Sequence, residues 1–394
     1  MLELNKYPYF KYILFCILYF SEGLVVGLTS VILVLFFTEK DISISIITLI
    51  GGITSIPWGI KFVFGPTIDF FGKLGRKFFI ILGGTIGSIS MFFLIFIDPE
   101  TYIIPFTIFL FLGHAGVVLL DVAVDAWAIQ TSKTKERGKI NSAMFTGLFA
   151  GTGIGGIILA LIASLYGFQM VFLTTGILIF LSFVIVLFIK EKKIKIQRKL
   201  IKPLLIKEFS KRNTQLIAIM GFVFSMNFGM LRFVIPEFMT KVLLLDKMQT
   251  GLLTSVYPLS IVIGAIFGGI AADRWGRKKV LYITLVGLLI SSGLLIFANT
   301  WDRLAMIYAM IGFMTGASGY SAMQALTMDI TNPKIGGAQY SFLASIANFG
   351  SITTGIISGS LVVFLGYNRF FFYTALTAGV TIFILIFIKE TIKK

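Results

Sequence analysis

The chain has 394 residues, of which 57% are hydrophobic and only 13% are charged. Because soluble globular domains carry roughly 25% charged residues, this composition excludes an ordinary soluble protein and indicates one that crosses a membrane several times. A formal net charge of +16 would also suit a nucleic-acid-binding protein, so the placement of the basic residues has to decide between the two.

Long continuous apolar runs predict membrane-spanning helices along the whole chain. A spanning helix needs roughly 20 predominantly apolar residues, whereas a membrane barrel is built from alternating segments of roughly 10 residues. We predict twelve spans, at about 10–37, 45–67, 78–97, 103–129, 139–165, 169–189, 215–239, 250–272, 280–298, 303–328, 337–363 and 368–388. The first run is longer than the apolar region of a signal peptide, so we expect no cleavable signal.

Lysine and arginine are concentrated in alternate connections between the spans. If the N-terminus is cytoplasmic, most of the 34 basic residues fall on the cytoplasmic side, above all in 190–212. This is the positive-inside bias of membrane proteins. The basic excess therefore reports topology, with both termini cytoplasmic, and we expect no nucleic-acid partner. Cys16 is the single cysteine, so no intrachain disulfide can form.

One long basic connection divides the chain into two halves. It predicts an N-terminal bundle at 1–189, a cytoplasmic linker at 190–214 and a C-terminal bundle at 215–394. A charged hairpin lies between the second and third spans of each half, GPTIDFFGKLGRK at 65–77 and GGIAADRWGRKK at 268–279. Equivalent motifs half a chain apart indicate an internal repeat. Parallel repeats with a substrate site between them are one plan of secondary transporters.

The second hairpin resembles the signature loop of the major facilitator superfamily, roughly G-x-x-x-D-R-x-G-R-[KR]-[KR]. The matching residues are Gly269, Asp273, Arg274, Gly276, Arg277 and Lys278, and the looser first copy has Gly65, Asp69, Gly75, Arg76 and Lys77. The resemblance implies an all-α membrane protein with twelve transmembrane helices in two six-helix pseudo-symmetric bundles. It also implies a cytoplasmic latch, which we expect to comprise Asp69, Arg76, Asp125, Asp273, Arg274 and Arg277. The alternative is basic charge that merely marks short cytoplasmic loops, which explains two equivalent hairpins less well.

Four further stretches resemble a narrower branch of that superfamily, which holds muropeptide permeases and acetyl-CoA transporters. They are YFSEGLVVGL at 19–28, PWGIKFVFGPTIDFF at 57–71, LLDVAVDAWAIQ at 119–130 and NPKIGGAQYSFLASIANFG at 332–350. Muropeptide permeases often carry extra spans, which this chain does not show, and PKIGGAQY is closer to the acetyl-CoA transporters. Both substrate classes therefore stay open.

Ionisable residues inside the predicted spans are candidates for the transport site, because charge in the membrane interior is costly. They are Glu22, Lys61, His114, Asp121, Asp125, Arg232 and Glu237. The resemblance implies that the first, fourth, seventh and tenth spans line the cavity, and all of these residues except Lys61 lie on those spans. The expected substrate or cavity residues are Glu22, Lys61, His114 and Arg232, with Tyr320 and Gln324 of the tenth span.

Depth along the helices predicts two ion pairs. Asp121 and Asp125 are four residues apart, so they share one helix face. At a rise of about 1.5 Å per residue, Lys61 reaches the depth of Asp121, which predicts a Lys61–Asp121 pair, with an Arg76–Asp125 pair at the cytoplasmic mouth. Glu22 lies near the midplane of its span. Glu22 and Asp121 are our candidates for proton coupling, although a static hydrogen-bonded role for Glu22 is equally compatible.

The other candidates each have a structural interpretation. His114 is the single histidine, and we favour a buried neutral imidazole bonded to a backbone carbonyl over a proton relay. Lys61 and Arg232 either neutralise buried acids or offer positive charge to an anionic substrate. Tyr320 and Gln324 either contact the substrate or join neighbouring helices by hydrogen bonds.

Small residues recur in two predicted spans, in GLFAGTGIGGIILA at 147–160 and in GSITTGIISGS at 350–360. Such spacing lets helices approach closely, which predicts tight helix packing; a moving surface between the two halves is the functional alternative.

The sequence favours a secondary active transporter and not an enzyme. It has no phosphate-binding loop of an ATP-driven motor and no metal-binding Cys/His cluster, so we expect no cofactor. Asp121 and Asp125 could serve a membrane prenyltransferase as magnesium ligands, but Asp329 stands alone where a second acidic cluster would be needed. We predict a monomer in the cell membrane that moves a polar, anionic organic solute by alternating access with protons. A muropeptide-like solute comes first, with acetyl-CoA, another organic anion or a sugar as alternatives.

Overall fold

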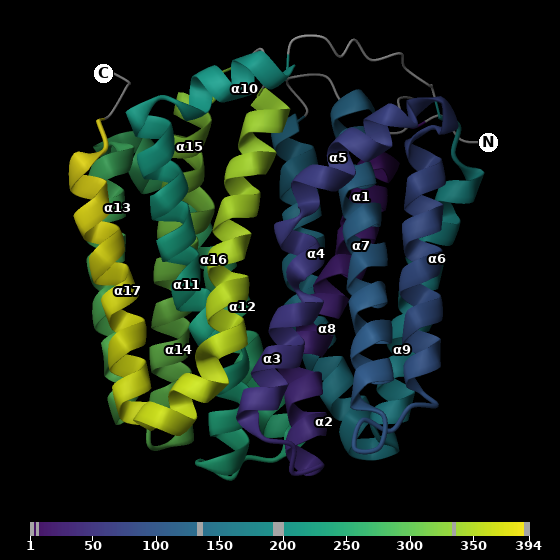
Figure 1. The fold of residues 1–394 in the computed structure, drawn as a ribbon, viewed down its shortest axis with the longest axis vertical. Helices are drawn as coiled ribbons and strands as arrows, with labels where there is room; N and C mark the ends of the chain where they lie inside the picture. Colours follow the sequence, from purple (N-terminus) through teal and green to yellow (C-terminus); the bar gives the residue numbers. More distant parts are fainter. Residues whose placement is uncertain (1–3, 5–7, 132–136, 192–200, 333–335, 390–394) are drawn as a thin grey trace. The chain divides into compact units, whose positions relative to one another are not determined.

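The computed structural model describes the chain except for residues 1–3, 5–7, 132–136, 192–200, 333–335 and 390–394, and the described part is almost entirely helical (Figure 1). Its first half contains α1 (Pro8–Gly27), η2 (Leu28–Ile32), α2 (Leu33–Glu39), α3 (Ile44–Thr54), α4 (Ile56–Gly59), α5 (Lys61–Phe70), η3 (Gly72–Leu74), α6 (Arg76–Leu94), α7 (Ile103–Thr131), α8 (Arg137–Tyr166), α9 (Phe168–Val184) and η5 (Ile185–Phe188). The second half contains α10 (Ile201–Phe209), α11 (Arg212–Lys241), α12 (Lys247–Trp275), α13 (Arg277–Leu294), η6 (Leu295–Phe297), α14 (Trp301–Thr315), η7 (Gly316–Met323), α15 (Gln324–Ile330), α16 (Gly336–Leu365) and α17 (Tyr367–Phe387).

Ten helices of the described chain are long and apolar enough to cross a membrane. The second and tenth predicted spans are not among these ten. The second is interrupted at Ser55 and Ile60, between α3, α4 and α5, and the tenth passes through the π-helical segment η7 between α14 and α15. The all-α fold is thus confirmed, and the count of twelve spans stays a prediction.

The backbone falls into two compact units. Unit 1 comprises Met1–Ile42, Ile53–Gln197 and Asp246–Leu252, and unit 2 comprises Ser43–Gly52, Arg198–Leu245 and Leu253–Lys394. The units follow the two halves of the sequence except for one short exchanged segment each. The domain boundaries at 189 and 214 therefore remain our proposal.

The two units repeat the same packing. In unit 1, α1 packs on α8, and α6 packs on both α7 and α9; in unit 2, α11 packs on α16, and α13 packs on both α14 and α17. Gly75 and Gly276, with φ of 90° and 91°, precede α6 and α13 at equivalent points of the two charged hairpins. Only glycine adopts such a backbone without strain, so the shared turn supports the internal repeat.

The glycine-rich stretches bring helices together inside each unit. A Cβ on Gly151 of α8 would lie 2.2 Å from the carbonyl oxygen of Phe20 in α1. A Cβ on Gly350 of α16 would likewise lie 2.0 Å from the carbonyl oxygen of Phe222 in α11. Both contacts are too short for any side chain, so these glycines permit close helix packing in each unit, in agreement with the packing interpretation. The moving-surface alternative stays untested.

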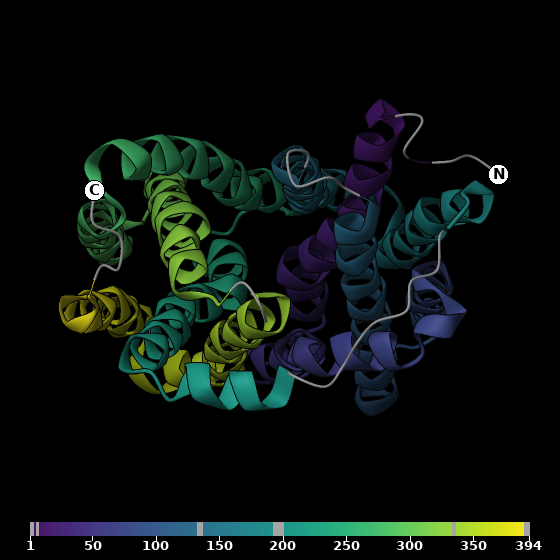
Figure 2. The same ribbon diagram turned by 90° about the horizontal axis from the view of Figure 1, so that it is seen from above.

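The basic linker contains a helix that we did not predict. Figures 1 and 2 show α10 lying across the ends of the long helices of unit 2. Its Glu208 is 3% exposed, pairs with Lys211 at 2.5 Å and accepts a hydrogen bond of 2.9 Å from Asn332. The Phe209 ring lies 5.2 Å from that of Phe342 in α16. The linker is therefore attached to unit 2 at its C-terminal end.

Candidate functional site

Unit 1 holds a group of polar side chains that we call the charged cluster. Tyr19, Glu22 and Asp121 are buried, and Lys61 and Asp125 are half-buried. The break at Ile60 ends α4 and makes Lys61 the first residue of α5. Its ammonium pairs with the carboxylate of Asp121 on α7, as predicted. Asp121 is only 1% exposed, against 24% for Lys61, so the pair faces the interior of the unit.

Asp125 has a partner that the sequence analysis missed. The Tyr19 hydroxyl of α1 donates a hydrogen bond to the Asp125 carboxylate. We predicted an ion pair between the Arg76 side chain and Asp125, and this pair stays a prediction; the backbone N–H of Arg76 donates to Glu191 at 2.5 Å. Tyr19 precedes Glu22 by three residues, which places both on one helix face. That spacing is the signal that could have found it.

Glu22 completes the charged cluster. It is 7% exposed and interacts electrostatically with Asp121, Lys61 and Asp125. Taking ions out of water costs several kcal/mol each unless opposite charge compensates them. With three carboxyls against one ammonium, the cluster carries two uncompensated negative charges when every carboxyl is ionised. It is therefore suited to hold protons, and to release or take them up when its geometry changes.

His114 is fully buried, and its hydrogen bonds fix its tautomer. The Trp58 Nε1–H can only donate, and it points at His114 Nδ1 at 3.1 Å, so Nδ1 accepts. The other nitrogen, Nε2, lies 2.7 Å from the Thr29 hydroxyl, which donates to the Val25 carbonyl at 2.8 Å. Nε2 therefore carries the proton and donates to Thr29. A neutral imidazole is what we favoured, although a hydroxyl stands between it and the backbone carbonyl.

This histidine network joins three helical elements next to the charged cluster. Thr29 lies in the π-helical segment η2, Trp58 in the short α4, and His114 in α7. The ammonium of Lys61 lies 5.4 Å from the centre of the Trp58 ring. Irregular helical segments are frequent at functional sites, and here the network holds two of them beside the Lys61–Asp121 pair.

Unit 2 brings together two of the predicted substrate residues. The Arg232 guanidinium in α11 lies over the rings of Phe228 and Phe233, at 5.8 and 5.1 Å. It also interacts electrostatically with Tyr320, which lies in η7 and is 38% exposed. Gln324 follows one turn later as the first residue of α15 and is half-buried. Arginine stacked on aromatic rings with a phenol nearby can bind a carboxylate or phosphate group.

Glu237 makes a contact of its own in unit 2. It is 8% exposed and accepts a hydrogen bond from the Tyr367 hydroxyl at the start of α17. This contact joins two helices of unit 2, which agrees with a structural role.

The latch residues differ in what they contact. Arg277 pairs with Asp329 and donates to the Ala325 carbonyl at 2.9 Å, so Asp329 is the partner of the signature arginine. Asp273 and Arg274 are exposed. Asp69 lies in α5, with its side chain outside the described part of the structure.

The lysines that follow the signature arginines cap helix ends in both units. Lys77 donates to the carbonyls of Leu187 and Ile189 at 2.7 and 2.8 Å. Lys278 donates to those of Ile386 and Ile388 at 3.3 and 2.6 Å. Because the last carbonyls of a helix lack partners within it, each lysine fastens the last long helix of its own unit. The signature motif thus has the same structural role in both units.

The two aspartates of α7 do not form an open metal site. Asp121 is paired with Lys61 and Asp125 with Tyr19. Among the residues that the structure describes, no group of three His, Cys, Asp or Glu side chains could hold a metal ion.

Comparison with known proteins supports the same fold and class. The sequence pattern of the Major Facilitator Superfamily matches residues 15–216 and again 217–394. A putative transporter AmpG 4 of Rickettsia conorii is 24% identical over 95% of this chain and 96% of its own. The anhydromuropeptide permease of Escherichia coli is 22% identical over 96% of this chain and 79% of its own.

Solved structures show the same fold at low sequence identity. The nucleoside transporter NupG superposes with a TM-score of 0.75 at 15% identity, over 95% of this chain and 98% of the other. A D-xylose–proton symporter gives 0.74 at 15% identity, over 97% of each chain.

These proteins are transporters and not enzymes, which excludes the prenyltransferase alternative. The many apolar helices and the relatives indicate a multi-pass integral protein of the cell membrane. The chain belongs to the Major Facilitator Superfamily and resembles its AmpG-like muropeptide permeases.

Proposed function

We propose that this transporter is a proton-coupled symporter for a polar, anionic organic solute, with an anhydromuropeptide-like compound as the first candidate. The charged cluster of unit 1 is the observation that carries the proposal. It sets three carboxyls against one ammonium, and two of the carboxyls, those of Glu22 and Asp121, are buried. Protons would balance the excess negative charge in at least one state of the transport cycle.

Glu22 is the proposed proton carrier within the cluster. Lys61 is paired with Asp121, and Tyr19 donates to Asp125. Glu22 interacts electrostatically with Asp121, Lys61 and Asp125 but forms no ion pair of its own in the described structure. The D-xylose–proton symporter, whose fold is similar, lends support to coupling by protons.

The anionic character of the solute rests on unit 2. Because Lys61 already neutralises Asp121, the proposed contact for a solute carboxylate or phosphate is Arg232, with Tyr320 and Gln324 as further polar contacts. The names of the relatives favour a muropeptide. Coenzyme A thioesters, other organic anions and sugars remain alternatives for the same site.

Transport in proteoliposomes tests the proton role. With Glu22→Gln we expect loss of solute accumulation driven by a pH gradient, while solute counterflow, which needs no net proton movement, is kept. Glu237→Gln is the matched control, because it removes a buried carboxyl that is bonded to Tyr367 outside the cluster, and it should keep both activities. Normal accumulation by Glu22→Gln would contradict the proposal.

A binding screen tests the solute class. Purified protein should be stabilised by its solute through mass action, so thermal unfolding is compared with anhydromuropeptides, coenzyme A thioesters, sugars and nucleotides. We expect stabilisation by the anhydromuropeptide and at least ten-fold weaker affinity for it in Arg232→Gln, read from the ligand concentration needed for the same stabilisation, since charge-assisted hydrogen bonds contribute roughly 1.5–3 kcal/mol. Stabilisation by an uncharged sugar alone, unchanged in Arg232→Gln, would reject the anion site.

A further inference from the structure

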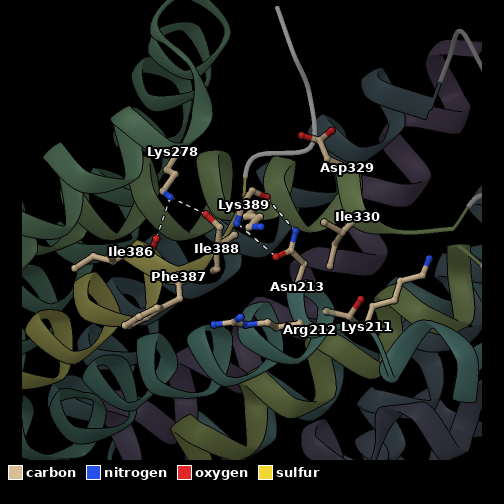
Figure 3. Close-up of a pocket in the computed structure, with 11 residues that line it drawn as sticks. Lys211, Arg212, Asn213, Lys278, Asp329, Ile330, Ile386, Phe387, Ile388 and Lys389 are labelled. Atoms are coloured by element: carbon tan, nitrogen blue, oxygen red, sulfur yellow. Dashed lines mark hydrogen bonds between the residues drawn. The ribbon is translucent and has the colours of Figure 1, made fainter.

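A second polar site lies in unit 2, at the end of the bundle that the charge distribution assigns to the cytoplasm. It is a cavity of about 820 Å³ between the start of α11, the start of α13 and the ends of α15 and α17. Figure 3 shows its lining side chains. The lining comprises Lys211, Arg212, Asn213, Thr214, Lys278, Asp329, Ile330, Ile386, Phe387, Ile388 and Lys389. None of them belongs to the charged cluster or to the group around Arg232.

The lining carries an excess of positive charge. Lys211, Arg212, Lys278 and Lys389 face a single acidic lining residue, Asp329. The Asp329 carboxylate is neutralised by Arg277, which lies outside the lining. Lys211 pairs with Glu208, so even with that pair discounted the lining keeps three cations. An occupant of this cavity should therefore be an anion.

The walls of the cavity are held in place by hydrogen bonds between its own elements. The Asn213 amide donates to the Lys389 carbonyl at 3.1 Å and accepts from the Lys389 N–H at 3.4 Å. Lys278 is fixed against the carbonyls that end α17. These contacts are drawn as dashed lines in Figure 3. They engage the Asn213 side chain, and the side chain of Lys211, the residue before α11, makes no capping hydrogen bond to its first turn. The N–H groups of that turn add positive potential to the same wall.

The position and the apolar part of the lining indicate where the anion comes from. Arg212 begins one candidate span, Lys278 is the second residue of another, and Phe387 ends a third. The cavity thus lies at the level where spans meet the headgroup region of the bilayer. Ile386 and Phe387 line it and are 54% and 44% exposed, as expected for side chains that face acyl chains. A soluble anion would gain no binding energy from this apolar wall, whereas an acyl chain would.

We propose that this cavity binds an anionic phospholipid, with the phosphate between Arg212, Lys278 and Lys389 and an acyl chain along Ile386 and Phe387. Basic pockets between membrane helices favour such headgroups. The bound lipid would join the ends of α11, α13 and α17, three helices of unit 2. The site lies outside the proposed transport pathway and does not depend on the proposed function.

Native mass spectrometry of the full-length protein in detergent tests the site, with phosphatidylglycerol and phosphatidylcholine as probes. We expect retention of phosphatidylglycerol and weaker retention of phosphatidylcholine. Near a membrane surface each Lys or Arg strengthens binding by about five-fold. Arg212→Gln and Lys389→Gln should therefore weaken phosphatidylglycerol binding about five-fold each, and about 25-fold together. Both residues are exposed, so the variants should fold.

The control is Arg369→Gln, which removes the same charge from an exposed residue at the other end of α17 and should leave lipid binding unchanged. Equal binding by wild type and the double variant would overturn the site, as would an equal loss in the control. Inorganic phosphate at millimolar concentration should not compete with phosphatidylglycerol. If it displaces the lipid completely and stabilises the protein by itself, the site binds a soluble phosphate and the lipid assignment is wrong.

Discussion

Replacing Lys61 by methionine should destabilise the protein in a pH-dependent manner. Methionine keeps a long unbranched side chain and a similar helix propensity, so the main change is loss of the ammonium that pairs with Asp121. Removing one partner of a buried ion pair costs about 3–5 kcal/mol. In the Lys61→Met variant the buried carboxyl of Asp121, 1% exposed, avoids this cost when it is protonated and neutral.

The cost of this proton sets the expected magnitude. An ordinary aspartate has a pKa of about 3.9, and each pH unit above it adds about 1.4 kcal/mol to the free energy of protonation. Lys61→Met should therefore lower the free energy of unfolding by about 4 kcal/mol at pH 7 and by about 1.5 kcal/mol at pH 5. The first value agrees with the range for broken buried pairs.

The assay is chemical denaturation in detergent micelles, followed by tryptophan fluorescence at both pH values. Lys61→Met/Asp121→Asn is the matched control, because it removes one positive and one negative charge and so restores the net charge of the cluster. It should recover most of the loss at pH 7. Equal destabilisation of Lys61→Met at pH 5 and pH 7, or a double variant no more stable than the single one, would refute the reasoning.

Three further predictions concern other parts of the structure. His114→Phe should lower the free energy of unfolding by about 1–3 kcal/mol for each polar partner left unpaired. It should keep the wild-type pH profile of solute uptake, because the imidazole is neutral, and a shifted profile would contradict a neutral imidazole. Gly151→Ala should lower the free energy of unfolding by about 1–3 kcal/mol, since the new Cβ would lie 2.2 Å from a backbone oxygen. In the same measurement Gly65→Ala should be neutral or stabilising, because a Cβ at Gly65 would meet no atom within 4 Å. The hydrogen bonds from Lys211 and Asn332 hold the pKa of Glu208 below its ordinary value, so this carboxylate adds stability above the ordinary pKa and loses it as the pH falls through the lower folded value. The difference in unfolding free energy between wild type and Glu208→Gln should therefore be constant from pH 7 down to the ordinary pKa of about 4.3 and shrink as the pH falls further; a difference that does not change with pH would argue against an ionised Glu208.

Features that depend on distance along a single helix were predictable from the sequence. The apolar runs, the repeated hairpins and the family follow from composition and spacing. The Lys61–Asp121 pair was predictable because the rise per residue is constant, so residue counts alone give the depth of both side chains. The glycines that precede α6 and α13 could also be read from the motif.

Features that depend on the rotation and approach of neighbouring helices were decided only by the tertiary structure. Asp125 could reach more than one donor at its depth, and the packing of α1 beside α7 gives it Tyr19. The tautomer of His114 follows from Trp58, which comes from a break in the second span that apolar composition does not reveal. The pairing of Arg277 with Asp329 and the cavity between α11, α13 and α17 likewise need side chains from different helices. A sequence fixes how far each residue lies along its own helix, but which side chains meet is set by the packing of helices against each other.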